Sequence, residues 1–312
     1  MSPPGTGKAG ASASIPGGPS EHGSSCLATV LRCGRKWTLT YGLGYRIKYP
    51  PAYLVHGSLY HAVCAYWHGA KVSKPPDWLA TPLGAALDEI GAGYPEQIRA
   101  AKDFAKFYPS FDAPRGCEPV MVEQEFGAPL AEIAGREQAG DVADERVTCR
   151  ADLVCRINGR TWLLDHKTVE PRGEHLQSWN DARAFATWGF LAMHNFRLVS
   201  LFVEDLAGFL VQRIKRSQPF EIDVNPLLIP VGAMQDYPRI MIEAVRRERQ
   251  ILAELKLEAG TERRLASAPN FTACDGRYGL CEYVAVCQTP RIEDRALILA
   301  AEFNQFPPVG EG

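Results

Sequence analysis

Asp152, Asp165 and Lys167 lie on the two arms of a hairpin that the sequence predicts around Asn158-Gly159. Alternating apolar residues flank this dipeptide, which is typical of a two-residue hairpin turn. In the resulting register the two aspartates face each other directly, and Lys167 lies two residues further along on the same face. Facing carboxylates repel each other unless a positive charge offsets them. This face is therefore a candidate site for a divalent cation assisted by a lysine.

A purely structural interpretation of the hairpin needs no metal. Aspartates near strand ends are commonly solvated or paired with a base, and Arg150 or Lys167 could fill that role. The hairpin alone leaves both interpretations open. Strand alternation assigns four apolar side chains to the face opposite the aspartates: Leu153, Cys155, Trp162 and Leu164.

A second group of chemically capable residues lies near the C-terminus. Cys274, Cys281 and Cys287 are separated by six and then five residues around a glycine-containing loop. Three thiolates need a fourth ligand to complete a tetrahedral or cubane site. Compact zinc sites usually contain Cys-x₂-Cys pairs, whereas wider spacing with a distant fourth cysteine suits an iron–sulfur cluster. Three buried free thiols are the alternative.

Composition limits the class of protein. The chain has 312 residues, 46 % of them hydrophobic, enough to bury the core of one large domain or two small ones. Its net charge of −2 provides no global field for nucleic acid, so any such binding requires a local basic surface. No apolar run approaches the roughly 20 residues of a membrane span, and no signal peptide is visible. Nine cysteines then indicate a reducing cytoplasm.

The elements that must position these residues follow from composition and periodicity. The Gly-, Pro-, Ser- and Ala-rich residues 1–22 are expected to be a disordered tail, residues 23–291 a folded domain and residues 292–312 a C-terminal tail. Helices are predicted at residues 26–42, 53–68, 95–108, 174–194 and 231–258. Besides the hairpin, strands are predicted at residues 119–126, 197–204, 209–214 and 220–224. In the second of these helices Gly57 and His61 share a face.

Taken in order, these motifs resemble those of RecB-like nucleases of the PD-(D/E)XK superfamily. The resemblance is to the four-cysteine iron–sulfur exonucleases of CRISPR adaptation and their phage relatives. It extends over roughly residues 24–290 and consists of five ordered motifs: Cys33-Gly-Arg-Lys36, Gly57-x₃-His61, Asp152, Asp165-x-Lys167 and the C-terminal cysteine trio. Each motif alone is weak, and their common order makes the case.

The resemblance implies an α/β fold with a restriction-endonuclease-like core, in which helices flank a central mixed β-sheet. It also implies that His61, Asp152, Asp165 and the backbone carbonyl of His166 bind Mg²⁺ or Mn²⁺. The His166 side chain is expected on the opposite face. Lys167 would orient the attacking water and stabilise charge in the transition state.

The resemblance further implies that Cys33, Cys274, Cys281 and Cys287 hold an iron–sulfur cluster of the [4Fe–4S] type. Such a cluster would clamp the N-terminal helix to the C-terminus. The compact family form has two residues between the first two clustered cysteines, whereas this chain has six. Zinc therefore stays open as the alternative.

The family usually carries Gln-x₃-Tyr on the helix after the lysine, where the glutamine contacts substrate. No glutamine here precedes a tyrosine at that spacing. Gln177 is the nearby glutamine, and Arg183 or Trp188 could take over its role in substrate binding.

The expected function is therefore a metal-dependent DNA exonuclease acting on single-stranded DNA or DNA ends. It would serve recombination or repair, phage DNA metabolism or CRISPR adaptation, in the cytoplasm and without a membrane partner. A homo-oligomer and recombination or adaptation proteins are further candidate partners. Two alternatives remain: a structure-specific endonuclease, and a catalytically inactive nucleic-acid-binding assembly subunit.

Overall fold

The computed structural model describes residues 22–112, 115–169, 181–257, 269–276 and 279–307. Nearly all of the expected N-terminal tail lies outside these residues. Among the described helices, none is long and apolar enough to cross a membrane.

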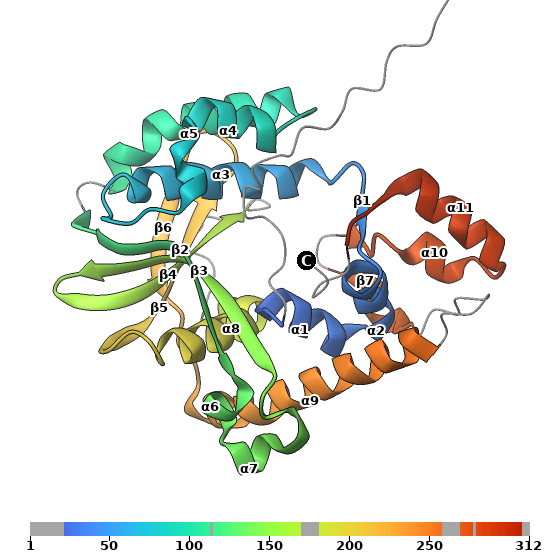
Figure 1. Ribbon diagram of the computed structural model, residues 1–312. Helices are drawn as coiled ribbons and strands as arrows, with labels where there is room; N and C mark the ends of the chain where they lie inside the picture. Colours follow the sequence, from blue (N-terminus) through green and yellow to red (C-terminus); the bar gives the residue numbers. More distant parts are fainter. Residues whose placement is uncertain (1–21, 113–114, 170–180, 258–268, 277–278, 308–312) are drawn as a thin grey trace, which may run out of the picture.

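A five-stranded mixed sheet forms the centre of the fold (Figure 1). Its order is β2-β3-β4-β5-β6, and the bounds are β2 Glu118–Pro129, β3 Arg146–Ile157, β4 Arg160–Val169, β5 Leu206–Lys215 and β6 Ile222–Pro226. All neighbours are antiparallel except β4 and β5, which are parallel. A parallel pair needs a crossover connection, and α8 (Asp181–Val199) lies in it. The expected mixed sheet flanked by helices is confirmed.

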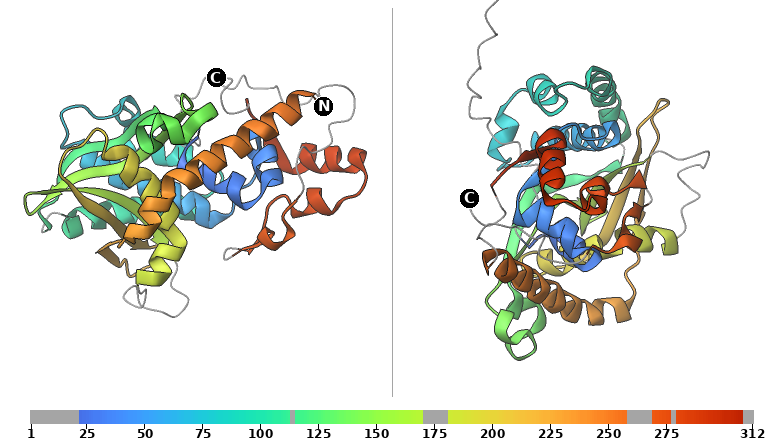
Figure 2. Two further views of the ribbon diagram at one scale, coloured as in Figure 1. Left: turned by 90° about the horizontal axis from the view of Figure 1, so that it is seen from below. Right: turned by 90° about the vertical axis from the view of Figure 1, so that its right-hand side faces the viewer.

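Helices cover both faces of this sheet (Figures 1 and 2). On one face lie α3 (Ala52–Gly69), α4 (Leu83–Ile90) and α5 (Pro95–Asp112). On the other face lie α1 (Ser24–Arg32), α8 and the long α9 (Val231–Leu257). The short α6 (Leu130–Ala134) and α7 (Arg136–Ala139) connect β2 to β3. The sheet therefore separates one hydrophobic cluster, on the side of α1, α8 and α9, from two clusters on the side of α3.

The first predicted helix is interrupted at its cysteine. Residues 26–42 were expected to form one helix, but α1 ends at Arg32, and Cys33 takes an extended conformation with φ −157° and ψ 107°. The short α2 (Gly34–Trp37) and a π-helical turn, Thr38–Gly42, follow. Apolar periodicity continues across this break, which is why the pattern did not reveal it.

The strand predicted at residues 197–204 is wrong, because α8 continues to Val199 and a turn follows. The physical reason is visible in the burial pattern. His194, Asn195, Leu198 and Val199 are all buried, a spacing that fits a helix and not a strand. The helix predicted at residues 174–194 thus extends five residues further than expected, to Val199, and its first seven residues lie outside the described part of the chain.

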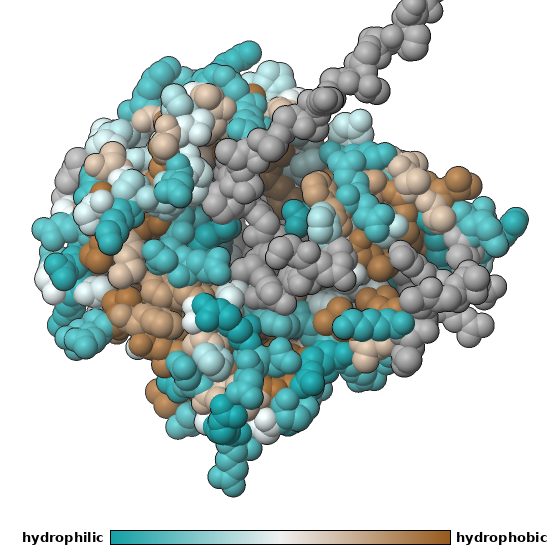
Figure 3. Space-filling view, in the orientation of Figure 1, coloured by the Kyte–Doolittle hydropathy of each residue, from teal (hydrophilic) through white to brown (hydrophobic). Residues whose placement is uncertain are grey.

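Residues 292–305 do not form the expected tail. They fold into α11 (Ile292–Glu302) and β9 (Phe303–Gln305), and β9 pairs with β1 (Tyr45–Ile47). With α10 (Val284–Gln288) they form a C-terminal unit beside α1 and α2 (Figures 1 and 2). Its small core contains Leu39, Tyr283, Val286, Leu299 and Phe303. Hydrophobic residues are visible on the surface of this unit (Figure 3). Leu297 of α11 is 68 % exposed.

His194 joins three elements inside the fold. Its ring nitrogens are 2.6 Å from the hydroxyl of Tyr237 on α9 and 2.6 Å from the carbonyl oxygen of Thr148 on β3. Complete burial lowers the pKa of His194 from 6.5 to about 4, against the Thr148 hydrogen bond, which favours protonation. The native imidazole therefore stays neutral where the unfolded one is protonated.

This difference predicts acid destabilisation. As the pH falls below 6.5, the unfolded chain binds a proton that native His194 does not, so stability declines towards pH 4. At pH 5 the loss from this residue is about 2 kcal/mol. We expect His194→Gln to reduce the difference in unfolding free energy between pH 8 and pH 5 by about that amount, as measured by urea denaturation. An unchanged difference would contradict the assignment.

Candidate active site

The predicted hairpin has the expected register but ends one pair early. Its ladder extends from Ile157–Arg160 to Leu153–Leu164. The next two residues are Asp152 and Asp165, which the ladder no longer includes. Instead, the backbone N–H of His166 donates a 2.8 Å hydrogen bond to Asp152 Oδ2. A side-chain carboxylate thus takes up an amide that a continuing ladder would have used.

The alternation of side chains between the two faces of the sheet is interrupted in β3 at Asp152. Ala151 packs in the cluster under α1, α8 and α9, whereas Leu153 and Cys155 pack with Ala65 of α3. Two residues of the same parity therefore point to opposite faces on the two sides of Asp152. The four apolar residues assigned to one face do share a cluster, but that face is the one covered by α3. It is consequently adjacent to the candidate chemistry and not remote from it.

A glutamate on β2 lies directly opposite Asp152. Val122 pairs with Leu153 and Gln124 pairs with Ala151, so Glu123 and Asp152 are the two residues between these pairs. Glu123 has φ 48°, in the left-handed region that a residue with a Cβ seldom adopts. Such strain persists only where the surroundings impose it, and it is common at functional sites.

Helix α3 supplies a third ligand to the same place. His61 Nδ1 lies 3.4 Å from Asp152 Oδ2. One ligand atom each from His61, Glu123 and Asp152 lie within 4.8 Å of one another. One imidazole nitrogen and two carboxylates form a donor set that suits Mg²⁺ or Mn²⁺. Glu123 was not identified as a ligand from the sequence. Its signal was the Glu123-x-Glu125 alternation on a predicted strand, which does not indicate which of the two carboxylates points towards the site.

Asp165 and Lys167 form an ion pair at the same end of the hairpin. Lys167 Nζ is 2.6 Å from Asp165 Oδ2, and the aspartate is almost entirely buried. Burial raises the pKa of Asp165 to about 7, although Lys167 opposes the shift, and Asp152 adds to it. Asp165 and Asp152 are thus close enough to influence each other's charge.

Electrostatics at this site favour a further positive charge. Burial, followed by Asp152, raises the pKa of Glu123 to about 8, even though Arg150 Nε lies 3.2 Å from its carboxylate. Burial also raises the pKa of Asp152, but His61, Lys167 and the His166 amide together leave it below its ordinary value. Three carboxylates with two cationic side chains nearby, Arg150 and Lys167, fit a site that binds a divalent cation.

His166 packs towards α3. Its ring lies edge-on to His61 and stacks with His68 at 6.1 Å between ring centroids, and its Nδ1–H donates to Gln212 Oε1. The side chain is buried and forms part of the support under the ligands. The proposed role of its backbone carbonyl as a ligand stays a prediction.

The structure supplies little for the expected substrate-binding residues. Gln177 lies outside the described residues, as does the side chain of Arg183, whose backbone belongs to α8. Trp188 is only 8 % exposed and packs in the main hydrophobic cluster. Its ring is therefore a core element and does not offer a free face to a base.

The four predicted cluster cysteines lie in the same region, beside α2, close enough for their charges to interact. Burial raises the pKa of Cys287 to about 11; Arg35 opposes this shift, while the neighbouring Cys281, Cys274 and Cys33 add to it. Two contacts join the segments that carry the cysteines: Asn270 Nδ2 donates to Arg32 O at 2.9 Å, and Lys36 Nζ lies 3.0 Å from Glu282 Oε2. The segment that carries Cys33 thus lies beside the segment that carries the C-terminal trio.

Comparison with known proteins agrees with this geometry. A family model of the PD-(D/E)XK nuclease superfamily matches residues 24–288. The chain belongs to the PD-(D/E)XK nuclease superfamily. This membership supports nuclease activity, the hydrolysis of phosphodiester bonds, and members of the superfamily typically use divalent metals.

A solved structure from Eubacterium rectale, described as a "Putative exonuclease", has a TM-score of 0.50 and 11 % identity. The similarity covers 88 % of this chain and 89 % of that one, and it shows a shared fold. A second structure, of SSO0001, has a TM-score of 0.28 and 15 % identity, covers 60 % of this chain and 74 % of that one, and is too dissimilar to support an argument. No curated protein matches the chain.

The geometry predicts that Glu123 contributes to metal binding. We expect Glu123→Gln to weaken Mn²⁺ binding by about tenfold or more, because ligand charge sets the affinity of such sites. Isothermal titration calorimetry measures this effect. Glu125→Gln is the matched control, since Glu125 lies on the same strand but is exposed. Equal affinities for the two variants would exclude Glu123 from the site.

Proposed function

We propose that the protein is a Mg²⁺- or Mn²⁺-dependent deoxyribonuclease that degrades single-stranded DNA or DNA from its ends. The observation that carries the proposal is that two pairs, His61 with Asp152 and Asp165 with Lys167, lie just beyond the same end of the β3–β4 ladder, close enough for their charges to interact. These residues come from separate parts of the chain, and superfamily membership supplies the reaction class.

In this proposal His61, Glu123, Asp152 and Asp165 hold the metal, together with the backbone carbonyl of His166. When bound, the metal would polarise the phosphate and lower the pKa of a water molecule. The chain's own residues orient these groups. The His166 amide fixes the Asp152 carboxylate, and Arg150 holds Glu123.

Lys167 is the proposed cationic catalyst. Its ion pair with Asp165 fixes the ammonium group next to the ligands, while 25 % of its side chain stays exposed and can reach a substrate. A preorganised cation in a partly dry site stabilises the charge that develops on phosphate oxygens. A solvated lysine without Asp165 would have no fixed position.

DNA affinity must come from local basic groups, because the net charge is −2. The basic stretch of β5 contributes less than its composition suggests. Arg213 is buried and bonded to Asp223, and Lys215 Nζ lies 2.7 Å from Glu221. Both side chains therefore stabilise the β5–β6 pair.

We also propose that Cys33, Cys274, Cys281 and Cys287 hold an iron–sulfur cluster. The proposal is supported by the proximity of these residues, whose charges interact, and by the extended backbone at Cys33, which interrupts the helix there. Such a cluster closes a loop of the chain from α1 to α10, so its loss would release the C-terminal unit. The action of the protein on DNA in the cytoplasm, as a homo-oligomer or with recombination or adaptation partner proteins, belongs to the same proposal.

Cleavage assays test the proposed activity. End-labelled linear and circular single-stranded DNA are incubated with Mn²⁺ and the pure protein. We expect progressive loss of the linear substrate from one end and no cutting of the circle. Cutting of the circle would indicate an endonuclease, and no cleavage of any DNA by the wild type would sink the enzymatic proposal.

Lys167→Met should lower the cleavage rate by about 10²-fold or more, because it removes the proposed transition-state cation. Its Mn²⁺ affinity should stay within a few-fold of the wild type, since lysine is not a ligand. Lys106→Met is the matched control, because Lys106 is 79 % exposed on α5. A Lys167→Met variant with normal cleavage would remove this residue from the mechanism.

For the cluster, anaerobically purified wild type should contain about four iron atoms per chain and show broad visible absorbance. Cys281→Ala should lose both, whereas Cys149→Ala, which removes a thiol buried in the main core, should retain them. A colourless wild type that carries zinc on the same cysteines would replace the cluster with a zinc site.

A further inference from the structure

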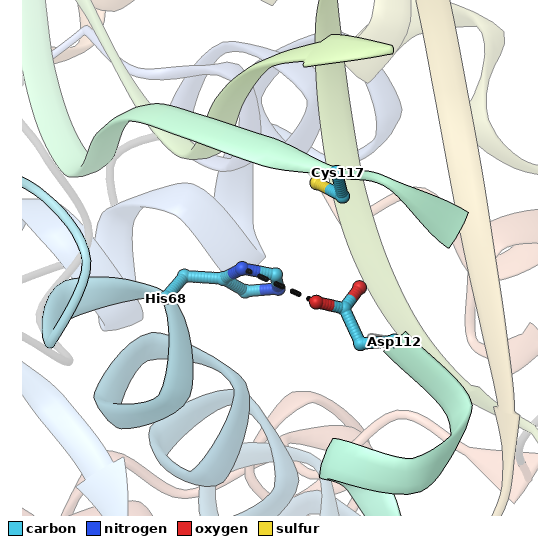
Figure 4. Close-up of side chains that lie close together, drawn as sticks. All are labelled: His68, Asp112 and Cys117. Carbon is cyan, nitrogen blue, oxygen red and sulfur yellow. Dashed lines mark ion pairs between the residues drawn. The ribbon is translucent and has the colours of Figure 1, made fainter. Parts of the chain in front are cut away.

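A second group of metal-ligating side chains lies buried behind the candidate active site. His68 comes from the last turns of α3, Asp112 from the end of α5 and Cys117 from the residue before β2. One ligand atom each from these three residues lie within 4.8 Å of one another. Figure 4 shows the ring, the carboxylate and the thiol converging from three separate segments. Their residual exposures are 1 %, 2 % and 9 %.

A fourth candidate ligand, Cys155, lies beside Cys117 and outside the 4.8 Å group of the other three. Cys155 of β3 is fully buried, and it pairs with Pro119, two residues after Cys117. The side chains of Cys117 and Cys155 are within hydrogen-bonding reach of each other. One imidazole, one carboxylate and two thiols are the ligand types that bind zinc tetrahedrally.

The hydrogen bonds of His68 leave a lone pair directed at the group. The Tyr108 hydroxyl donates to Gln212 Oε1 at 3.1 Å, so its oxygen accepts the Nε2 proton of His68 at 2.9 Å. In the neutral ring Nδ1 then carries no proton. It is buried and makes no hydrogen bond. Second-shell bonds of this kind fix the tautomer of metal-binding histidines.

The unprotonated Nδ1 faces another acceptor. Asp112 Oδ2 lies 3.9 Å away, and Asp112 Oδ1 is buried without a hydrogen bond. Two lone-pair-bearing atoms facing each other in a buried place repel unless a cation lies between them. Trp67 and Lys71 contact Asp112 Oδ2 at 2.8 and 3.5 Å, and Arg115 lies 3.5 Å from Oδ1. These contacts neutralise the carboxylate but leave the Nδ1 of His68 without a partner.

From this geometry we propose that His68, Asp112, Cys117 and Cys155 form a buried structural site for a zinc-type divalent cation. Charge balances in this site. Binding brings two positive charges and releases the protons of the two thiols, so the net charge beside Lys71 and Arg115 is unchanged. A closed set of four protein ligands leaves no open position, which is the mark of a structural and not a catalytic site.

The location gives the cation a consequence for the active site. Helix α3 carries His61 two turns before His68, and β2 carries Glu123 six residues after Cys117. A metal that joins α3, α5, β2 and β3 therefore fixes the relative position of two candidate active-site ligands. His68 also stacks on His166, whose amide holds Asp152.

Elemental analysis of the full-length protein, expressed with added zinc, tests this proposal without reference to DNA cleavage. We expect the wild type to contain about one zinc per chain beyond any held by the C-terminal cysteines. Cys117→Ala and Asp112→Asn should each lose that one equivalent. Asp112→Asn has nearly the same shape as the native residue and keeps an acceptor for the Trp67 hydrogen bond. A loss of zinc in this variant is therefore not explained by a failure to fold. Cys149→Ala and Cys281→Ala should both retain it.

Cobalt provides an independent readout. Co²⁺ added to chelator-treated Cys281→Ala should give the intense thiolate charge-transfer and tetrahedral visible bands of a sulfur-containing site. The double variant Cys281→Ala/His68→Gln should lack these bands, while its far-ultraviolet circular dichroism should be unchanged. A wild type without this zinc, or a zinc and cobalt signal that persists in Cys117→Ala and His68→Gln, would overturn the proposal.

Discussion

The carboxylates of Glu123, Asp152 and Asp165 lie close enough for their charges to interact, and this mutual repulsion is the constraint on which the site depends. Burial and neighbouring acids raise the pKa of Glu123 to about 8 and that of Asp165 to about 7. Arg150 and Lys167 supply two positive charges, one at each end of the group. A divalent cation between them would complete the charge balance. The arrangement is costly as an unliganded structure and reasonable as a metal site.

The backbone departs from regular strand geometry at one point to allow this arrangement. The left-handed φ of Glu123 and the change of facing in β3 at Asp152 occur at opposite positions of adjacent strands. Together they turn two side chains of an otherwise regular sheet towards α3, where His61 meets them. The early end of the β3–β4 ladder then frees the His166 amide to hold Asp152. A local departure from strand geometry thus creates the site.

Sequence reasoning reached the parts of this structure that depend on local chemistry. Asn158-Gly159 determined the hairpin register, and the spacing of Gly57 and His61 placed the histidine on a helix. It missed Glu123, because strict alternation cannot anticipate a residue with positive φ. The extended Cys33 was hidden for the opposite reason, since apolar periodicity continues through the break. The β1–β9 pair is three residues long and joins distant segments, so no local sequence pattern predicts it.

The most direct measurement of the central claim is the position of manganese in crystals of the full-length protein. Anomalous diffraction from crystals grown with Mn²⁺ should show a peak at coordination distance, about 2.0–2.6 Å, from His61, Glu123 and Asp152 together. At a saturating concentration of Mn²⁺, anomalous peaks found only elsewhere, with no metal bound to these three side chains and no change in their positions, would contradict the account.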